Sequence, residues 1–304
     1  MEEPRLWGSQ MIANDNIIRP AAAPTPAPAP ASVEAWSGKD RGDENFPVGS
    51  VLIAAPLRAH VHAYYAFARN GDDIADSPAL APAEKIGRLD QMEAVLLGER
   101  EDGSPSAKRL RDSFAKSGVP DIHARELLIA FRRDAVKNRY ESWAELLDYC
   151  RYSAAPVGRF LLDLHGEAHT TWPASDALCA SLQVLNHLQD CARDLRGLDR
   201  CYVPQDWLKA EGLSTDDIAR PETTPALRIV FDKMLDATEQ LNALAVTLVP
   251  QVKNRRMRIE SAIIVQLALR LTTKLRHGDP LATRVKLSKF DILTATLSGL
   301  RHIL

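Results

Sequence analysis

Three carboxylates share one face of a helical pattern in the first third of the chain. Residues 64–76 read YYAFARNGDDIAD, and a helix turns by about 100° per residue. That turn brings together a tyrosine, a guanidinium and three carboxylates: Tyr65, Arg69, Asp72, Asp73 and Asp76. Such a group is either a solvated helix face or a site for a hard divalent cation, because Mg²⁺ is typically held by one or two carboxylates together with substrate phosphates. A second acidic patch facing the first would decide between the two interpretations.

A second polar stripe lies in the second half of the chain, where residues 186–194 read NHLQDCARD. On a helix this stripe holds amides, a guanidinium and two carboxylates: Gln183, Asn186, Asp190, Arg193 and Asp194. An amphipathic surface helix has a similar pattern, but here the usual lysines and glutamates are missing. Arg200 and Tyr202 follow in DLRGLDRCYVP. Two acidic helices and a basic loop are suited to a magnesium-bound diphosphate.

Composition narrows the class of protein. The chain has 304 residues, 45% of them hydrophobic, which is enough for a large core. A net charge of -2 gives no reason to expect a nucleic acid as partner. Four cysteines without CxxC or Cys/His spacing favour reduced thiols in a cytoplasmic protein. No apolar run reaches the roughly 18 to 20 residues that cross a bilayer, so any membrane contact is expected to be peripheral.

The order of the chain predicts a tail followed by one helical domain. Residues 20–32 read PAAAPTPAPAPAS, a tract that cannot form a core, so we expect a disordered tail over 1–43 and a folded domain over 44–304. Apolar residues recur with helical spacing, and Gly, Pro, Asn and Asp clusters mark the breaks. We predict an all-α domain with helices over 57–76, 82–98, 105–116, 121–137, 142–165, 174–195, 204–211, 214–218, 224–250, 255–277 and 286–303.

Two local features keep alternatives open. Small residues and a proline (AAPVG, 154–158) interrupt one helical pattern, either for a tight helix crossing or to widen a cavity. The basic cluster at 253–258 is either a lipid-surface patch or, as its pattern favours, a solvated helix start. A basic run at 284–289 is expected to contact the diphosphate if it folds over the cavity mouth.

These motifs resemble those of the squalene/phytoene synthase family, the head-to-head trans-isoprenyl diphosphate synthases. The resemblance rests on YAFAR before DDIAD, on NHLQDCARD and on DRCYVP, and it covers roughly residues 45–284. It implies an all-α isoprenoid synthase fold with a central cavity, where two aspartate-rich helices bind Mg²⁺ and a prenyl diphosphate. ENFPVGS at 44–50, RYSAAPVGR at 151–159 and Gln189 are similar to the hydroxysqualene-forming branch of bacterial hopanoid biosynthesis.

Pattern and resemblance together assign roles to particular residues. The resemblance implies four metal-binding and catalytic carboxylates: Asp72, Asp76, Asp190 and Asp194. Tyr65 is expected as a further catalytic residue. The expected substrate-binding residues are Phe46, Arg69, Asp73, Tyr149, Gln183, Asn186, Arg193, Arg200, Tyr202 and Arg284. Of these, Tyr149 either borders the cavity or packs in the core.

Three functions remain open from the sequence. The first is a carbon–oxygen lyase that ionises presqualene diphosphate with Mg²⁺, lets water near Gln183, Asn186 and His187 capture the carbocation, and releases pyrophosphate. The second is a head-to-head prenyltransferase that makes presqualene diphosphate, squalene or phytoene from prenyl diphosphates such as farnesyl diphosphate. The third is a non-enzymatic assembly or lipid-binding protein.

Differences from the family pattern, and the aspartates that match it, help to choose among these three functions. Acidic and amide residues at 43–45 replace the serines that the family often has before Phe46, and Ala268 stands where some relatives have a tyrosine. These departures count against condensation of two farnesyl diphosphates and leave diphosphate ionisation intact. The retained aspartates count against a non-enzymatic protein, because a scaffold has no need of paired like charges.

Overall fold

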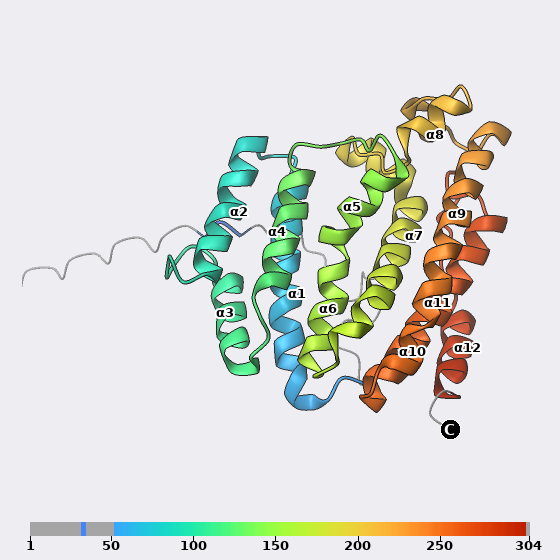
Figure 1. Cartoon of the computed structure of the whole chain (residues 1–304). Coiled ribbons are helices and arrows are strands. Elements are labelled where there is room, and N and C mark those ends of the chain that lie inside the picture. Colours follow the sequence, from blue (N-terminus) through green and yellow to red (C-terminus); the bar gives the residue numbers. More distant parts are fainter. Residues whose placement is uncertain (1–31, 35–51, 302–304) are drawn as a thin grey trace, which may run out of the picture. The chain divides into compact units, whose positions relative to one another are not determined.

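A computed structural model describes residues 32–34 and 52–301, and short loops join its helices (Figure 1). The α-helices are α1 Ala55–Asp76, α2 Pro82–Leu96, α3 Pro105–Ser117, α4 Ile122–Asp134, α5 Trp143–Ser153, α6 Ala155–Leu164, α7 Trp172–Leu198, α8 Gln205–Ala210, α9 Pro225–Val246, α10 Leu248–Gln251, α11 Arg255–His277 and α12 Lys289–Leu300. Two 3₁₀ turns occupy His169–Thr171 and Thr215–Ala219. The only β-pairing in the described residues is an isolated bridge. The predicted all-α fold is confirmed.

Capping residues and prolines explain where the helices begin. Ser104, Ser142 and Thr224 each accept a hydrogen bond from a backbone N–H in the first turn of α3, α5 and α9, respectively. In six helices a proline occupies one of the first two positions, where a backbone N–H would have no partner within the helix: α1, α2, α3, α6, α7 and α9. In the described part of the chain, no helix combines the length and apolar character that crossing a membrane requires.

The helix predicted over 142–165 is divided at Ala154 into α5 and α6. Pro156 lies in the first turn of α6, where it removes no helical hydrogen bond. Gly158 packs so closely on α7 that a Cβ at this position would lie 2.5 Å from the Ser175 hydroxyl. The small residues therefore permit a tight crossing of α6 and α7.

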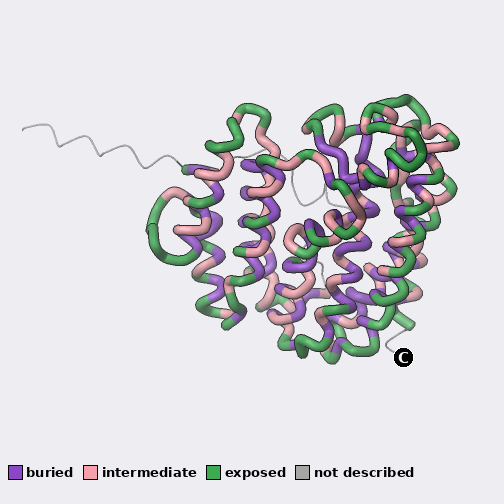
Figure 2. The backbone as a smooth tube through the Cα atoms, turned by 45° about the horizontal axis from the view of Figure 1, so that its top comes forward, coloured by how far each residue is buried: buried purple, intermediate pink, exposed green. Residues whose placement is uncertain are grey.

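Two hydrophobic cores meet at α6. One core is formed by α1 to α4 together with Phe160 and Leu164 of α6, and the other is formed mainly by α5, α7, α9 and α11. Leu161, also on α6, packs against both cores. Figure 2 shows the buried residues on the inner sides of the helices. Residues of α6 thus contribute to both cores.

Three residues of the predicted tail pack on the loop before α3. Val33 is 8% exposed, and its N–H donates to the carbonyl of Gly103 (2.8 Å). The Glu34 carboxylate accepts hydrogen bonds from the Ser104 hydroxyl (2.8 Å) and the Ser106 N–H (2.6 Å). The structure differs here from the expected tail, because a carboxylate at a helix N-terminus satisfies N–H groups that lack intrahelical partners. The boundary predicted near residue 44 lies outside the described residues.

Replacing Glu34 by alanine is expected to cost about 1 kcal/mol, as does the loss of a helix cap. For a domain of this size the melting temperature should fall by about 2–4 °C. Glu101→Ala is the matched control, since that glutamate is 70% exposed and pairs with Lys108 and Arg111 only at the surface. Differential scanning calorimetry measures both variants. Equal melting temperatures for the two variants would show that Glu34 does not stabilise the fold.

Candidate active site

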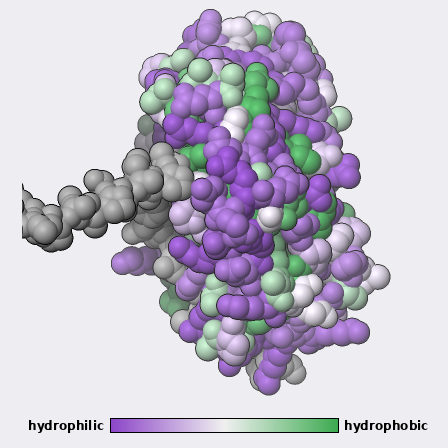
Figure 3. All heavy atoms as spheres, turned by 90° about the vertical axis from the view of Figure 1, so that its left-hand side faces the viewer, coloured by the Kyte–Doolittle hydropathy of each residue, from purple (hydrophilic) through white to green (hydrophobic). Residues whose placement is uncertain are grey.

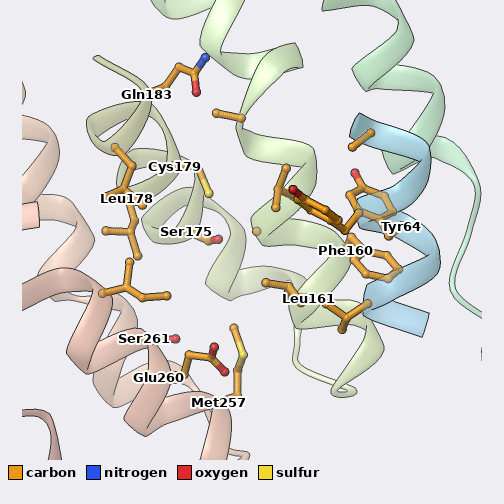
Figure 4. A pocket seen from close by; sticks show the side chains of 18 of the residues that line it. Tyr64, Phe160, Leu161, Ser175, Leu178, Cys179, Gln183, Met257, Glu260 and Ser261 are labelled. Atoms are coloured by element: carbon orange, nitrogen blue, oxygen red, sulfur yellow. The ribbon is translucent and has the colours of Figure 1, made fainter. Parts of the chain in front are cut away.

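A cavity of about 340 Å³ lies between α1, α6, α7 and α11 (Figure 4). Tyr64 and Phe160 stack in its wall with ring centroids 4.0 Å apart. Gly158 lines the cavity as well, so the small residues that bring α6 close to α7 also leave space beside the crossing. The hydroxyls of Ser153 and Ser261 are buried in the lining without a hydrogen-bond partner. The cavity is thus largely apolar, with a few polar groups facing inward.

The two acidic motifs follow the cavity on α1 and α7. On α1, Tyr65 lines the cavity, and the DDIAD motif ends the helix. On α7, Gln183 and Asn186 line the cavity, and Asp190 and Asp194 follow along the same face. Both helices therefore run from the cavity toward their acidic ends. Asp72, Asp76, Asp190 and Asp194 are not themselves among the lining residues, and we call the region beyond the cavity where they lie the acidic mouth.

Burial and like charge raise the pKa values of carboxylates at this mouth. Burial raises the pKa of Asp194 to about 6, and the nearby carboxylates of Asp190 and Asp76 raise it as well. The positive charge of Arg193 lowers it, but by less. Burial and the neighbouring Asp76 carboxylate also raise the pKa of Asp72, although 38% of its side-chain surface is exposed. Because Asp76 and Asp194 come from different helices, this coupling shows that the two motifs lie within electrostatic reach of each other.

Arginines neutralise part of this charge. Arg69 pairs with Asp73 on its own helix (2.6 Å). Arg284 donates to both oxygens of Asp190, from Nε (3.0 Å) and Nη2 (3.2 Å), and Arg193 contacts the same carboxylate (2.8 Å). The side chains of Arg193 and Arg284 are 63% and 46% exposed, so both guanidinium groups remain accessible from solvent.

The segment that carries Arg284 folds back over α7. The side-chain amide of Gln189 donates to the carbonyl of Val285 (2.6 Å), which fixes this segment beside Asp190. The sequence predicted a contribution from Arg284 only if its segment covered the cavity mouth. The structure brings the segment to Asp190, at the acidic end of α7.

Arg200 forms a buried network behind the mouth. Its guanidinium is paired with the Asp76 carboxylate and donates to the backbone carbonyls of Ala75 (3.2 Å) and Asp134 (2.9 Å). The residue is 6% exposed. Burial acts to lower the pKa of Arg200, but Asp134 and other nearby acidic groups outweigh it, so the net pKa is raised. Arg200 is therefore a permanent cation that holds Asp76.

Asp134 belongs to this network and was missed by the sequence analysis. Its carboxylate accepts a hydrogen bond from the Tyr149 hydroxyl (2.8 Å) and has one oxygen without a partner. Burial raises its pKa to about 7, against Arg200 and Tyr149. In FRRDAVKNRY the residue resembles an ordinary charged helix end. Its spacing from Leu127 and Ala130, which lie on the buried face of α4, was the one available signal.

Three aromatic residues, Tyr149, His187 and Tyr202, pack on one another outside the cavity lining. Tyr149 packs on Tyr202 with ring centroids 5.6 Å apart, and His187 stacks on Tyr202 at 3.5 Å. None of the three is among the residues that line the described cavity. Burial lowers the pKa of His187 to about 3, and Arg200 acts in the same direction. Tyr149 therefore packs in the core, which is the other alternative that the sequence left open. His187 follows Asn186 on α7 and is turned about 100° away from it, outside the cavity lining. Phe46 lies outside the described residues.

The carboxylates fit a magnesium ion that a substrate helps to hold. Carboxylate oxygens are ligands that Mg²⁺ prefers. In residues 32–34 and 52–301, however, no three His, Cys, Asp or Glu side chains are grouped closely enough to hold an ion by themselves. This donor set suits an ion that takes one or two carboxylates from the protein and its other ligands from phosphate and water.

Sequence comparisons point to one family. A model of the squalene/phytoene synthase family matches residues 39–291. A hydroxysqualene synthase from Sinorhizobium fredii is 46% identical and covers 83% of this chain and 86% of its own length. One from Rhodopseudomonas palustris is 44% identical and covers 88% of this chain and 91% of its own length.

Solved structures agree in fold. A squalene synthase from Alicyclobacillus acidocaldarius matches with a TM-score of 0.69 and 32% identity, over 78% of this chain and 90% of that chain. A dehydrosqualene synthase in complex with a ligand matches with a TM-score of 0.71 over 86% of this chain and 92% of that chain, and its 19% identity supports the fold alone. With a sequence match over most of its length and two acidic helix ends at one cavity, the chain belongs to the squalene/phytoene synthase family.

Proposed function

We propose that this protein is a hydroxysqualene synthase, a carbon–oxygen lyase that acts on presqualene diphosphate. The bond between carbon and the diphosphate oxygen breaks, and its electron pair leaves with pyrophosphate. The oxygen of a water molecule then bonds to the carbocation, and the water loses a proton. The supporting observation is a largely apolar cavity that ends at an acidic mouth. Three enzymes named hydroxysqualene synthases, 41–46% identical over most of the chain, support this product.

The mouth is suited to a diphosphate. Arg193 and Arg284 are partly exposed and belong to different segments, so they can turn from Asp190 toward phosphate oxygens, which a planar guanidinium binds in pairs. The four carboxylates that would hold Mg²⁺ are Asp72, Asp76, Asp190 and Asp194. Mg²⁺ bound there supplies positive charge that stabilises the departing pyrophosphate.

Arg200 positions a carboxylate and does not bind the diphosphate in this proposal. Its guanidinium is occupied by Asp76 and two backbone carbonyls, and the residue is buried. Leaving this network would expose an unpaired buried charge on Asp76 or Arg200, which is costly. The sequence-based role of Arg200 in substrate binding is thus replaced by a role in orienting Asp76.

The cavity wall is suited to a carbocation and to its capture. The stacked rings of Tyr64 and Phe160 can stabilise a cation by about 0.5–2 kcal/mol each. Water needs two or more polar partners to remain in such a wall. Polar groups of the lining that can hold it include the amides of Gln183 and Asn186, the unpartnered hydroxyls of Ser153 and Ser261 and the buried carboxylate of Glu260 (Figure 4).

Asp190→Asn should lower turnover by at least about 100-fold, because it removes a charged ligand at the mouth. Its present partners are partly exposed arginines, so the melting temperature should change little. Asp236→Asn on α9 is the control, since that carboxylate is 66% exposed and pairs only with Arg276. Steady-state rates at several Mg²⁺ concentrations measure the effect. Near-normal turnover of folded Asp190→Asn would refute the metal assignment.

Asp134→Asn should change how stability depends on pH. The folded-state pKa of about 7 exceeds the ordinary value of about 3.9, so the folded protein holds an extra proton between about pH 4 and 7. Its free energy of unfolding therefore falls as pH rises through that window. The difference in melting temperature, Asp134→Asn minus wild type, should therefore be larger at pH 7.5 than at pH 5.

The exposed Asp148→Asn provides the control for that comparison, because its side chain is 49% exposed and pairs with Arg133 at the surface. It should give the same difference from wild type at both pH values. If Asp134→Asn behaves like this control, the carboxyl of Asp134 does not take up the extra proton.

The product identifies the reaction. Purified protein incubated with presqualene diphosphate and Mg²⁺ in ¹⁸O-labelled water should form hydroxysqualene with one labelled oxygen, whether or not NADPH is present. Mass spectrometry detects the label. Squalene as the main product with NADPH would favour the head-to-head prenyltransferase instead. An unlabelled alcohol would show that the carbon–oxygen bond stays intact and would contradict the proposed reaction. Farnesyl diphosphate in a parallel reaction tests the prenyltransferase alternative.

A further inference from the structure

Helix α12 buries its small residues and exposes its large apolar ones. Ala295 is fully buried, and a Cβ at Gly299 would lie 2.6 Å from Cγ1 and 3.2 Å from the backbone nitrogen of Ile263 on α11. The exposed residues are Phe290 (70%), Ile292 (48%), Leu293 (54%), Leu297 (54%) and Leu300 (41%). A helix on the surface of a globular protein normally faces its core with the larger apolar residues.

Four of these exposed residues form a stripe. At about 100° per residue, Phe290, Leu293, Leu297 and Leu300 fall within about 80° of one another. In the described part of the chain, five of the thirteen exposed large hydrophobic residues lie on this one helix. On the face that α2 and α3 form, by contrast, hydrophilic residues predominate (Figure 3). The stripe is therefore a concentration of apolar surface and not a scatter of single residues.

Basic residues frame the stripe. Lys286, Lys289 and Arg301 are all exposed. Asp291 is the only carboxylate between Lys286 and Arg301. It accepts hydrogen bonds from the N–H (2.7 Å) and hydroxyl (2.5 Å) of Ser288 and pairs with a lysine of α11 (3.0 Å). Residues 286–301 thus offer three exposed cations beside the stripe, while the one carboxylate of this segment is already engaged.

Further basic residues lie beyond the C-terminal end of α12. Asp291 pairs with Lys274 and Gly299 packs on Ile263, so α12 runs antiparallel to α11. Its C-terminal end therefore points toward the beginning of α11, where further exposed cations stand: Lys253, Arg255 and Arg256. The sequence pattern favoured a solvated helix start for that cluster over a lipid-surface patch, and its place beyond the end of α12 supports the lipid-surface alternative.

We propose that α12 docks the protein onto a lipid surface that carries anionic headgroups. The stripe enters the boundary between headgroups and acyl chains, and Lys286, Lys289 and Arg301 contact the headgroups. A second copy of the chain fits this surface less well, because a two-fold contact would bring the same cations together with no free carboxylate to pair them. The proposal does not rest on the proposed activity, because the apolar stripe belongs to α12, although Lys286 lies in the segment that also brings Arg284 to Asp190.

Vesicle sedimentation of the full chain tests this surface. Wild type should bind vesicles of equimolar phosphatidylcholine and phosphatidylglycerol more tightly than phosphatidylcholine alone. Phe290→Glu with Leu297→Glu should weaken binding by at least about tenfold. The matched control is Ile229→Glu with Leu244→Glu on α9, whose side chains are exposed to a similar extent (54% and 46%). This control should bind like wild type.

A second pair of variants separates charge from apolar contact. Lys286→Glu with Lys289→Glu should remove most of the preference for phosphatidylglycerol and leave the weak binding to phosphatidylcholine. Turnover of detergent-dispersed presqualene diphosphate by Phe290→Glu with Leu297→Glu should equal that of wild type, which separates docking from catalysis. Circular dichroism checks that every variant is folded.

Three results would overturn the proposal. The first is wild type that does not bind either kind of vesicle, and the second is equal loss of binding in the α12 and α9 variants. The third comes from light scattering: a wild-type dimer that Phe290→Glu with Leu297→Glu converts to a monomer would show that a second copy covers α12.

Discussion

Carboxylates at the acidic ends of α1 and α7 are the constraint on which the rest of the site depends. Asp76 is the last residue of α1, and Asp194 lies in the last turns of α7. A helix C-terminus carries partial negative charge, so these positions disfavour carboxylates even before the two motifs repel each other. Burial, together with the charge of neighbouring carboxylates, also raises the pKa values of Asp72 and Asp194, so ionising these groups in place is costly. Cations have to compensate this cost.

The compensation has a fixed part and an exchangeable part. Arg200 is buried, donates to two backbone carbonyls and is paired with Asp76, so its position is fixed by the fold. Arg193 and Arg284 hold Asp190 from partly exposed positions and are free to turn to a phosphate. The division between two hydrophobic cores, with α6 between them, supplies the apolar cavity that leads to this mouth. Charge at the mouth and dryness behind it are both needed to ionise a prenyl diphosphate.

Much of the fold followed from local sequence, because its signals act over a few residues. Apolar spacing and breaks at Gly, Pro, Asn and Asp clusters located the helices, and the content of DDIAD and NHLQDCARD indicated two acidic faces before their arrangement was known. The kink at Pro156 was also visible, although the sequence could not show that it both tightens a crossing and lines a cavity. The sequence did not identify Asp134 as a site residue, because its burial depends on a loop more than sixty residues away in the chain. The places of Tyr149 and His187 depend on how α5 and α7 are rotated in the fold, which no local pattern specifies.

Calorimetric titration of the full chain with inorganic pyrophosphate tests most directly whether the acidic mouth binds cation and diphosphate as one unit. The structure shows no carboxylate group able to hold a metal ion alone in the described residues. We therefore expect Mg²⁺ alone to bind weakly, and pyrophosphate to bind at least about tenfold more tightly with Mg²⁺ than with EDTA. Pyrophosphate binding of equal strength in Mg²⁺ and in EDTA would contradict the account.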